Sequence, residues 1–504
     1  MELESMCDEV PDEIHKDLGS SHRSESKFCH MVLGKRKVML AVSQLLVLFF
    51  LCASLYGILG SDVLLRSEIF ALLLLSVIAH IAGKVVSLIK LPPLIGMLII
   101  GFLFRNLPFI PFYKNISIRW ATTLRASAFV IILLKAGLGL DAEKLKSLKL
   151  IVFQLAFSPC IVEAMVISIT SHFLLNLPWT WAIMLGFVIS AVSPAVVVPG
   201  LLNLQDRSIG IKKGIPTLVI AAASVDDILA ITGFTIMFSV SLSAGSNLWI
   251  TLLKGILEPV GGLTYGILFG VTFWILPGSQ SFSSTSLFYH VILLCLGGFA
   301  GMFLSKRLEI AGAGPMACLV MAFVASLHWK KDIQHLESIE KTIGVVWIIL
   351  QPFLFSLIGA EVSVQNLQSN LGNTILVLLI ALAFRIVTAM FASFGGDFNL
   401  KENIFIAVAW LPKATVQAAV GPQALDYVLT NNMGKEMEDL AQKILTGAVL
   451  SIIMTAPIGA ALIAILGPLL LSHDNKTDKK ELNQLEENVN KDESRSDFDV
   501  SNQA

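Results

Sequence analysis

Long apolar runs alternate with short polar connections along this chain, and each end of the chain is a polar segment. A helix needs about 20 consecutive apolar residues to cross the hydrocarbon core of a bilayer. The pattern therefore predicts an all-α polytopic membrane protein with fourteen transmembrane helices. These predicted spans lie near residues 41–59, 68–89, 92–109, 120–138, 150–174, 179–201, 214–240, 249–275, 287–304, 312–328, 343–362, 372–393, 403–425 and 441–468.

The terminal segments, residues 1–34 and 472–504, hold too few apolar residues to form a core of their own. We expect disordered cytoplasmic tails there, on either side of a transmembrane domain over residues 35–471. An even number of spans places both termini on one side of the membrane. Lysine and arginine are more frequent in the connections on that side, which indicates that it is the cytoplasmic side.

The composition agrees with this class of protein. Hydrophobic residues make up 55% of the chain and charged residues 14%, whereas a soluble domain is about 25% charged. The net charge of −1 gives no sign of a nucleic-acid partner, so the lipid bilayer is the expected surroundings. The predicted layout places Asn115 outside as a glycosylation candidate; the alternative is that it lies too close to the membrane to be modified.

Two predicted spans contain helix-breaking residues at the depth of the membrane. Residues 179–201 include Pro194 and Pro199, and residues 403–425 include Pro412. A proline removes a backbone donor and restricts the residue before it. A simple kink would explain one such span, but two of them with opposite directions favour a transporter built from inverted repeats. Its core helices are expected at about residues 150–240 and 372–468.

The adjacent residues Asp226 and Asp227 lie in the middle of an apolar run, residues 215–233. A carboxylate at this depth costs at least about 2.5–3.5 kcal/mol, and two neighbouring carboxylates also repel each other. We interpret the pair as a site for a monovalent cation or a proton; the alternative is a structural acid pair held by basic residues. Adjacent helical residues point about 100° apart, and we expect Asp227 to be the main ligand and Asp226 a helper or proton carrier.

Three further charged residues, Glu163, Arg385 and Lys413, are expected at membrane depth. Buried charges usually pair, and we hypothesise a permanent ion pair between Glu163 and Arg385, whose guanidinium is hard to deprotonate. Lys413 is expected at the crossing of the broken helices, where it neutralises helix ends or an aspartate. A role for Lys413 in coupling is the alternative.

Na⁺ and Li⁺ favour oxygen ligands, and the hydroxyl groups of four residues are candidates to complete the site: Ser193, Thr217, Ser224 and Thr415. If a cation and a proton compete for the same carboxylates, and only the occupied site crosses the membrane, the two gradients are coupled. The sequence has no phosphate-binding loop or nucleophile motif, so we expect a secondary transporter that needs no cofactor. The rival hypotheses are a cation channel or leak, and a regulatory homologue that does not transport.

Three stretches of the sequence resemble a known family. Residues 221–229 (AAASVDDIL) resemble the paired-aspartate motif of monovalent cation/proton antiporters, and residues 353–363 (FLFSLIGAEVS) and 410–419 (WLPKATVQAA) are similar to the animal branch, solute carrier family 9 subfamily B. The resemblance covers roughly residues 40–470.

This resemblance implies an NhaA-type fold with a dimerisation domain, a mobile six-helix core and an extra N-terminal helix that packs against the partner of a homodimer. It implies exchange of Na⁺ or Li⁺ for H⁺ at Asp226 and Asp227, a Glu163–Arg385 bridge, Lys413 near the crossing, and a role in pH regulation. The family includes a sperm-type member of the flagellum, which we favour, and a broader member of plasma, endosomal and mitochondrial membranes.

Overall fold

The computed structural model describes isolated residues between Met39 and Gly60, and then eleven continuous stretches together with the single residue Ile310. The stretches are residues 67–88, 91–107, 116–139, 149–210, 213–242, 248–276, 284–308, 313–330, 332–362, 364–394 and 396–472. The predicted tails apart from Ser472, nearly all of the first predicted span, and Asn115 lie outside the described residues.

All regular elements of the described residues are helices. They are α3 (Glu68–Leu88), α4 (Pro93–Asn106), α5 (Ile118–Gly139), α7 (Lys149–Leu175), α8 (Trp179–Ser190), α9 (Pro194–Asp206), α10 (Ile215–Leu242), α11 (Leu248–Ile275), α12 (Ser284–Arg307), α13 (Ala313–Trp329), α14 (Ile333–Glu361), α15 (Val364–Ser393), α16 (Leu400–Ala409), α17 (Thr415–Val420), α18 (Gln423–Thr430) and α19 (Lys435–Leu470). Every predicted span from residues 68–89 onward coincides with one or more of these helices.

The count of fourteen spans is not confirmed. Nine of the described helical segments are long and apolar enough to cross a membrane, and two shorter apolar helices, α4 and α13, accompany them. Part of the difference has a structural reason, since residues 403–425 form the short pieces α16, α17 and the start of α18 instead of one long helix. The coarser prediction of an all-helical protein with membrane-spanning helices holds.

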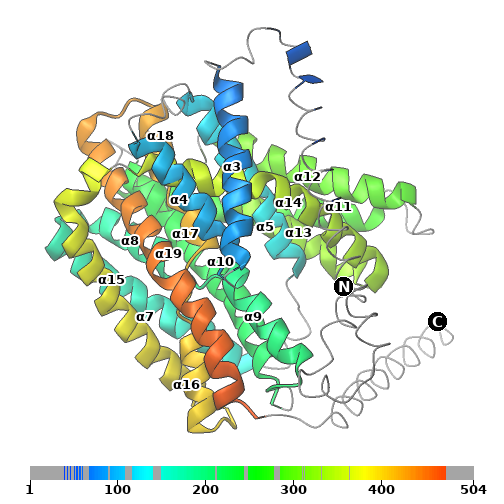
Figure 1. Cartoon of the computed structure of the whole chain (residues 1–504), viewed down its shortest axis with the longest axis vertical. Helices are drawn as coiled ribbons and strands as arrows, with labels where there is room; N and C mark the ends of the chain where they lie inside the picture. The colour runs from blue at the N-terminus through cyan, green and yellow to red at the C-terminus, as the bar shows by residue number, and fades with distance from the viewer. Residues whose placement is uncertain are drawn as a thin grey trace, which may run out of the picture. The chain divides into compact units, whose positions relative to one another are not determined.

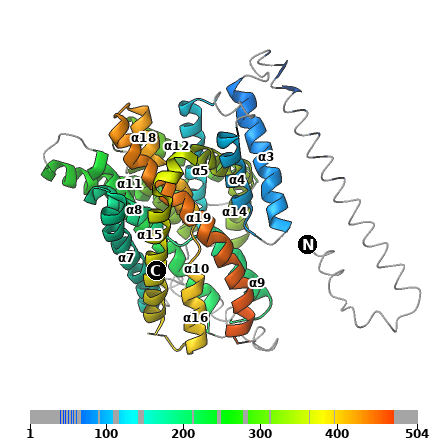
Figure 2. The ribbon, with the colours of Figure 1, turned by 60° about the vertical axis from the view of Figure 1, so that its left-hand side comes forward.

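The chain divides into two units, Met1–Ala71 and Leu72–Ala504. The described part of the first unit consists of isolated, mostly helical residues and the beginning of α3. In the second unit, α15 packs against α7, and α7 also packs against α8 and α10. Figures 1 and 2 show α9 and α16 at one end of this bundle and α18 at the opposite end. The two interrupted helices, α8–α9 and α16–α17, therefore run in opposite directions through the bundle.

Helices α4 and α14 approach closely because glycines line their contact. A Cβ atom on Gly101 would overlap the carbonyl oxygen of Ser356, and one on Gly359 would overlap that of Leu98. Small residues allow this approach in membranes, where helices associate through van der Waals packing more than through the hydrophobic effect.

Candidate functional site

The two broken helices meet at their breaks. The first break, residues 191–193, separates α8 from α9, and the second, residues 410–414, separates α16 from α17. Pro194 is the first residue of α9, a position where no helical partner exists for the N–H that proline lacks. The Ser193 amide donates a hydrogen bond to the Pro412 carbonyl at 2.8 Å. The breaks are thus joined directly to each other through their backbones.

Basic side chains cover the carbonyl ends of the half-helices at the crossing. The Ser190 carbonyl, at the end of α8, accepts hydrogen bonds from the Arg385 guanidinium and, at 3.2 Å, from the Lys413 ammonium. Arg385 Nε also donates to the Trp410 carbonyl, just after α16, at 2.7 Å. Cations are stabilised at helix C-termini by the helix dipole, which explains why both bases lie here.

A neutral side chain supports the same break. Gln417 Nε2 donates to the carbonyls of Ile189 at 3.2 Å and Ala191 at 2.8 Å, while Gln417 itself is fully buried. These bonds satisfy carbonyl groups that have no helical partner, which is a requirement for irregular backbone at membrane depth.

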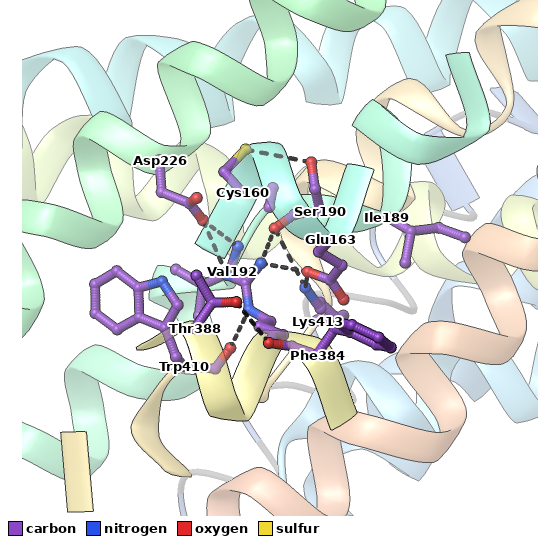
Figure 3. Close-up of polar contacts among 12 residues, drawn as sticks. Cys160, Glu163, Ile189, Ser190, Val192, Asp226, Phe384, Thr388, Trp410 and Lys413 are labelled. Carbon is purple, nitrogen blue, oxygen red and sulfur yellow. Dashed lines mark hydrogen bonds and ion pairs between the residues drawn. The ribbon is translucent and has the colours of Figure 1, made fainter. Parts of the chain in front are cut away.

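Glu163 is shared between the two bases. Its Oε2 atom accepts a hydrogen bond from the Arg385 guanidinium and lies 2.6 Å from Lys413 Nζ, and all three side chains are fully buried. The structure thus brings Glu163 and Arg385 together, and adds Lys413 to the pair. Figure 3 shows Glu163 and Lys413 on one side of the break near Val192 and Asp226 on the other.

Asp226 is held from two directions. Its Oδ2 atom accepts a hydrogen bond from the Val192 amide at 2.6 Å and lies 3.3 Å from a guanidinium nitrogen of Arg385. Arg385 therefore bridges two carboxylates, whereas the sequence analysis paired it with Glu163 alone. The other carboxylate oxygen of Asp226, Oδ1, is buried without a hydrogen-bond partner among the described residues.

Asp227 follows Asp226 on α10, so its side chain leaves the helix about 100° away from that of its neighbour. The residue is 6% exposed, and its Oδ1 atom is buried with no hydrogen-bond partner in the described part of the chain. The charged groups that act on it are Asp226, Arg385 and Lys413. Among the described residues, no ion pair or hydrogen bond fixes this side chain, in contrast to the contacts that fix Asp226.

The structure brings together only some of the predicted oxygen ligands. Ser193 Oγ lies 3.2 Å from Thr415 Oγ1 and accepts a hydrogen bond from the Thr415 amide, so these two meet at the crossing. Thr217 lies ten residues before Asp227 on α10, about 15 Å along the axis, which is too far for both to bind one ion. The side chain of Ser224 lies outside what the structure describes.

Sequence reasoning missed several residues of the site. Gln417 was one, although a glutamine next to the second break is a recognisable signal. Thr455 was another; its hydroxyl accepts a hydrogen bond from the Lys413 amide at 2.9 Å. Cys160 Sγ lies 3.3 Å from Ser190 Oγ, where an isolated cysteine in an apolar helix gave no signal.

A second buried charge network was also absent from the prediction. The Arg125 guanidinium of α5 contacts Asp426 of α18, and its NH1 atom lies 3.2 Å from Glu361 at the end of α14. It joins three helices but none of the residues around Asp226.

Comparison with known proteins places the chain in a family. The family model described as "Sodium/hydrogen exchanger, transmembrane" matches residues 72–466. Sodium/hydrogen exchanger 9B2 of Homo sapiens is 43% identical over 449 residues, which covers 87% of this chain and 82% of the relative. Sodium/hydrogen exchanger 9B1 of Homo sapiens is 41% identical over 450 residues, which covers 87% and 86%.

The fold is also similar to a solved structure. The sodium proton antiporter MjNhaP1 from Methanocaldococcus jannaschii matches with a TM-score of 0.66 over 80% of this chain and 98% of its own, at 18% sequence identity. The relatives are named for ion exchange, in agreement with the expectation of a transporter and not an enzyme. Since the family model spans most of the sequence, this chain belongs to the sodium/hydrogen exchanger family, within the 9B group that its residues 221–229, 353–363 and 410–419 resemble.

Proposed function

We propose that this chain is a secondary active antiporter that exchanges Na⁺ or Li⁺ for H⁺ by alternating access of the Asp226–Asp227 pair. The observation that carries the proposal is the contrast between the two acids. Asp226 is held by Val192 and Arg385, whereas Asp227 keeps a buried carboxylate oxygen with no hydrogen-bond partner among the described residues. Asp227 is therefore the carboxylate that takes the cation and the proton in turn.

The charges of the site suggest the stoichiometry. Three carboxylates, Glu163, Asp226 and Asp227, lie near two bases, Arg385 and Lys413. When all are ionised the net charge is −1, because three negative charges oppose two positive ones. One monovalent cation or one proton neutralises the cluster, and a neutral cluster is the form that crosses a low-dielectric region at least cost. We propose exchange of one cation for one proton.

The remaining ligands come from both breaks. Ser193 and Thr415, whose hydroxyl oxygens lie 3.2 Å apart, provide hydroxyl groups from both breaks, and the Gln417 Oε1 atom is buried without a partner in the described part of the chain. Ser224 stays a candidate, and Thr217 is replaced by these groups. Glu163, Arg385 and Lys413 act as the structural and coupling charges, and no cofactor takes part.

The proposal includes the number of membrane spans and their arrangement. We place fourteen spans in residues 35–471, arranged as NhaA-type inverted repeats with core helices at about residues 150–240 and 372–468, between disordered cytoplasmic tails. The opposite directions of α8–α9 and α16–α17 support the repeats. A homodimer, glycosylation at Asn115 and a role in pH regulation complete it.

The proposed location is the plasma membrane, with the sperm flagellum as the specific site. The nearly equal identities to exchangers 9B1 and 9B2 do not select one member, and endosomal and mitochondrial membranes are the alternatives. Imaging of the tagged protein in sperm and in somatic cells tests this part.

Transport is tested in liposomes that contain the purified chain and a pH-sensitive dye. A Na⁺ or Li⁺ gradient should drive proton movement in the wild type, and Asp227→Asn should abolish it. Glu337→Gln is the matched control, because Glu337 is an exposed carboxylate on α14. Exchange that survives both Asp226→Asn and Asp227→Asn would remove the assignment of the site.

The rival functions give different results in the same assay. A channel would carry a Na⁺ current that needs no proton movement in the opposite direction. A regulatory homologue would show no cation-driven proton movement in the wild type, although it is folded and inserted.

A further inference from the structure

Glu258 is a further carboxylate in the described helices that the exchange site does not use. It is the eleventh residue of α11, about 15 Å from the start of that helix, and it is 9% exposed. An ionisable residue inside a membrane is costly, and such residues usually mark ion pathways or proton relays.

Glu258 contacts the helix that carries the exchange site. Its Oε2 atom accepts a hydrogen bond of 2.7 Å from Ser239 Oγ of α10. Ser239 follows Asp227 by twelve residues, about 18 Å along the axis of α10. Glu258 therefore lies between the exchange site and the end of α10, which the predicted layout places outside.

Two polar residues of α10, Thr235 and Ser239, lie between Asp227 and Glu258. Thr235, one turn before Ser239, is buried, and its Oγ1 atom has no hydrogen-bond partner among the described residues. Positions four residues apart on a helix are separated by about 400° of rotation, which is about 40° more than a full turn. The strip of positions 227, 231, 235 and 239 therefore winds slowly around α10 as it leaves Asp227. Ile231, which is 2% exposed, is the apolar residue one turn after Asp227 and one turn before Thr235 on this strip.

The contact also joins two groups of helices. Helix α10 packs against α7, α8, α9 and also α11, and α11 packs in addition, and mainly, against α13. Because Glu258 is on a different helix from Asp227, it can receive an ion before or after the ion occupies Asp227.

We propose that Glu258, oriented by Ser239, is a second cation- and proton-binding position on the route between Asp227 and the membrane face at which α10 ends. This proposal rests on the proposed exchange at Asp227. The carboxylate attracts the small monovalent cation and raises its local concentration, and it accepts the proton that leaves by the same route.

The test is Glu258→Gln in the liposome assay, with the rate measured as a function of Na⁺ concentration. Glutamine keeps the size of the side chain and still accepts the Ser239 hydrogen bond, so only the charge is lost. We expect the Na⁺ concentration for half-maximal exchange to rise at least about threefold, since charged clefts raise ion on-rates by about tenfold or more. An unchanged half-maximal concentration in a folded E258Q protein overturns the proposal.

Ser239→Ala separates charge from hydrogen bonding. This variant removes the orienting bond and keeps the carboxylate charge, so the half-maximal concentration should rise less than in E258Q. A shift as large as that of E258Q would assign the effect to helix packing and overturn the proposal. If E258Q does not fold, Glu258→Asp, which keeps the charge, takes its place; a rise of about twofold or more in E258D overturns the proposal, and a smaller rise supports it.

Thermal unfolding separates this proposal from the exchange site itself. Saturating Na⁺ should still raise the melting temperature of E258Q, because Asp227 is intact, and should not raise that of Asp227→Asn. If Asp227→Asn exchanges and binds Na⁺ like the wild type, the proposed function fails. If Asp227→Asn loses exchange while E258Q keeps the half-maximal Na⁺ concentration of the wild type, the second position fails and the exchange site stands.

Discussion

Lys413 Nζ lies 2.6 Å from Glu163 Oε2, although the two residues are 250 positions apart in the chain. The same oxygen accepts a hydrogen bond from Arg385. This buried carboxylate thus contacts both bases, and Asp226 and the ends of α8 and α16 supply the remaining acceptors. The stability of each buried charged group in the site therefore depends on the other charged groups.

Glu163→Gln should therefore be strongly destabilising. It leaves Arg385 and Lys413 buried next to each other with one carboxylate fewer, and removal of one partner of a buried ion pair costs about 3–5 kcal/mol. A lower melting temperature of the detergent-solubilised protein is the expected observation. Glu337→Gln, at an exposed position, should melt like the wild type; equal melting of both variants would contradict the shared role of Glu163.

The charge-exchange variant Glu163→Arg with Arg385→Glu should not restore the fold. A Glu163–Arg385 pair on its own would tolerate the exchange, but Lys413 would then lie beside the new arginine, and Asp226 beside the new glutamate. Like charges at buried sites are strongly unfavourable. Recovery of the wild-type melting temperature in the double variant would show that the two bases act independently.

Asp226→Asn and Asp227→Asn should have different effects on stability and on Na⁺ binding. The Asp226→Asn variant loses the ion pair with Arg385, although its amide oxygen can still accept a hydrogen bond from the Val192 amide, so it should lose stability as well as exchange. Asp227→Asn should fold like the wild type and lose Na⁺-induced stabilisation. Melting temperatures with and without Na⁺ measure both effects, and a loss of stability confined to Asp227→Asn would reverse the assignment.

Exchange by the wild type should be independent of membrane potential. The cluster is neutral with one cation and neutral with one proton, so the exchange of one for the other moves no net charge. An imposed K⁺ diffusion potential in the liposomes should leave the initial rate unchanged. A rate that rises or falls with the potential would show that the count of charges is incomplete.

Gly101→Ala should destabilise the contact between α4 and α14. A methyl group there would overlap the Ser356 carbonyl oxygen, and overpacking of this kind costs about 1–3 kcal/mol. Gly344 provides the control on α14, because nothing lies within 4 Å of its position for a Cβ atom. Gly344→Ala should be neutral or stabilising, and equal effects of the two substitutions on the melting temperature would argue against the close packing.

The sequence predicted the breaks well because proline acts locally. The first break ends at Pro194, and the second contains Pro412. Pro199, in contrast, lies inside α9 and does not interrupt it, since a proline only removes one helical hydrogen bond and the surrounding helices can compensate. The positions of the buried charges were equally visible, because a charge in an apolar run stands out.

The partners of those charges were not predictable from sequence. Glu163 lies 222 residues from Arg385, and which atoms meet depends on how α7, α8 and α15 pack. Sequence alone also favoured Thr217 over Gln417, because hydroxyl groups near the aspartates in the chain appear near in space until the helix rise is counted. Local chemistry thus indicated the kinds of groups, and tertiary packing selected the ones that meet.

The backbone hydrogen bond from Ser193 to Pro412 has a consequence for how the protein can evolve. Separation of these two loops would leave an amide and a carbonyl unsatisfied in a medium of low polarity, so the loops travel together as one unit. In the proposed exchanger, the helices around this unit then decide the entry and exit of ions, whereas the unit itself decides ion preference. Relatives can accordingly alter which ion they carry, or on which side it is released, through separate sets of substitutions.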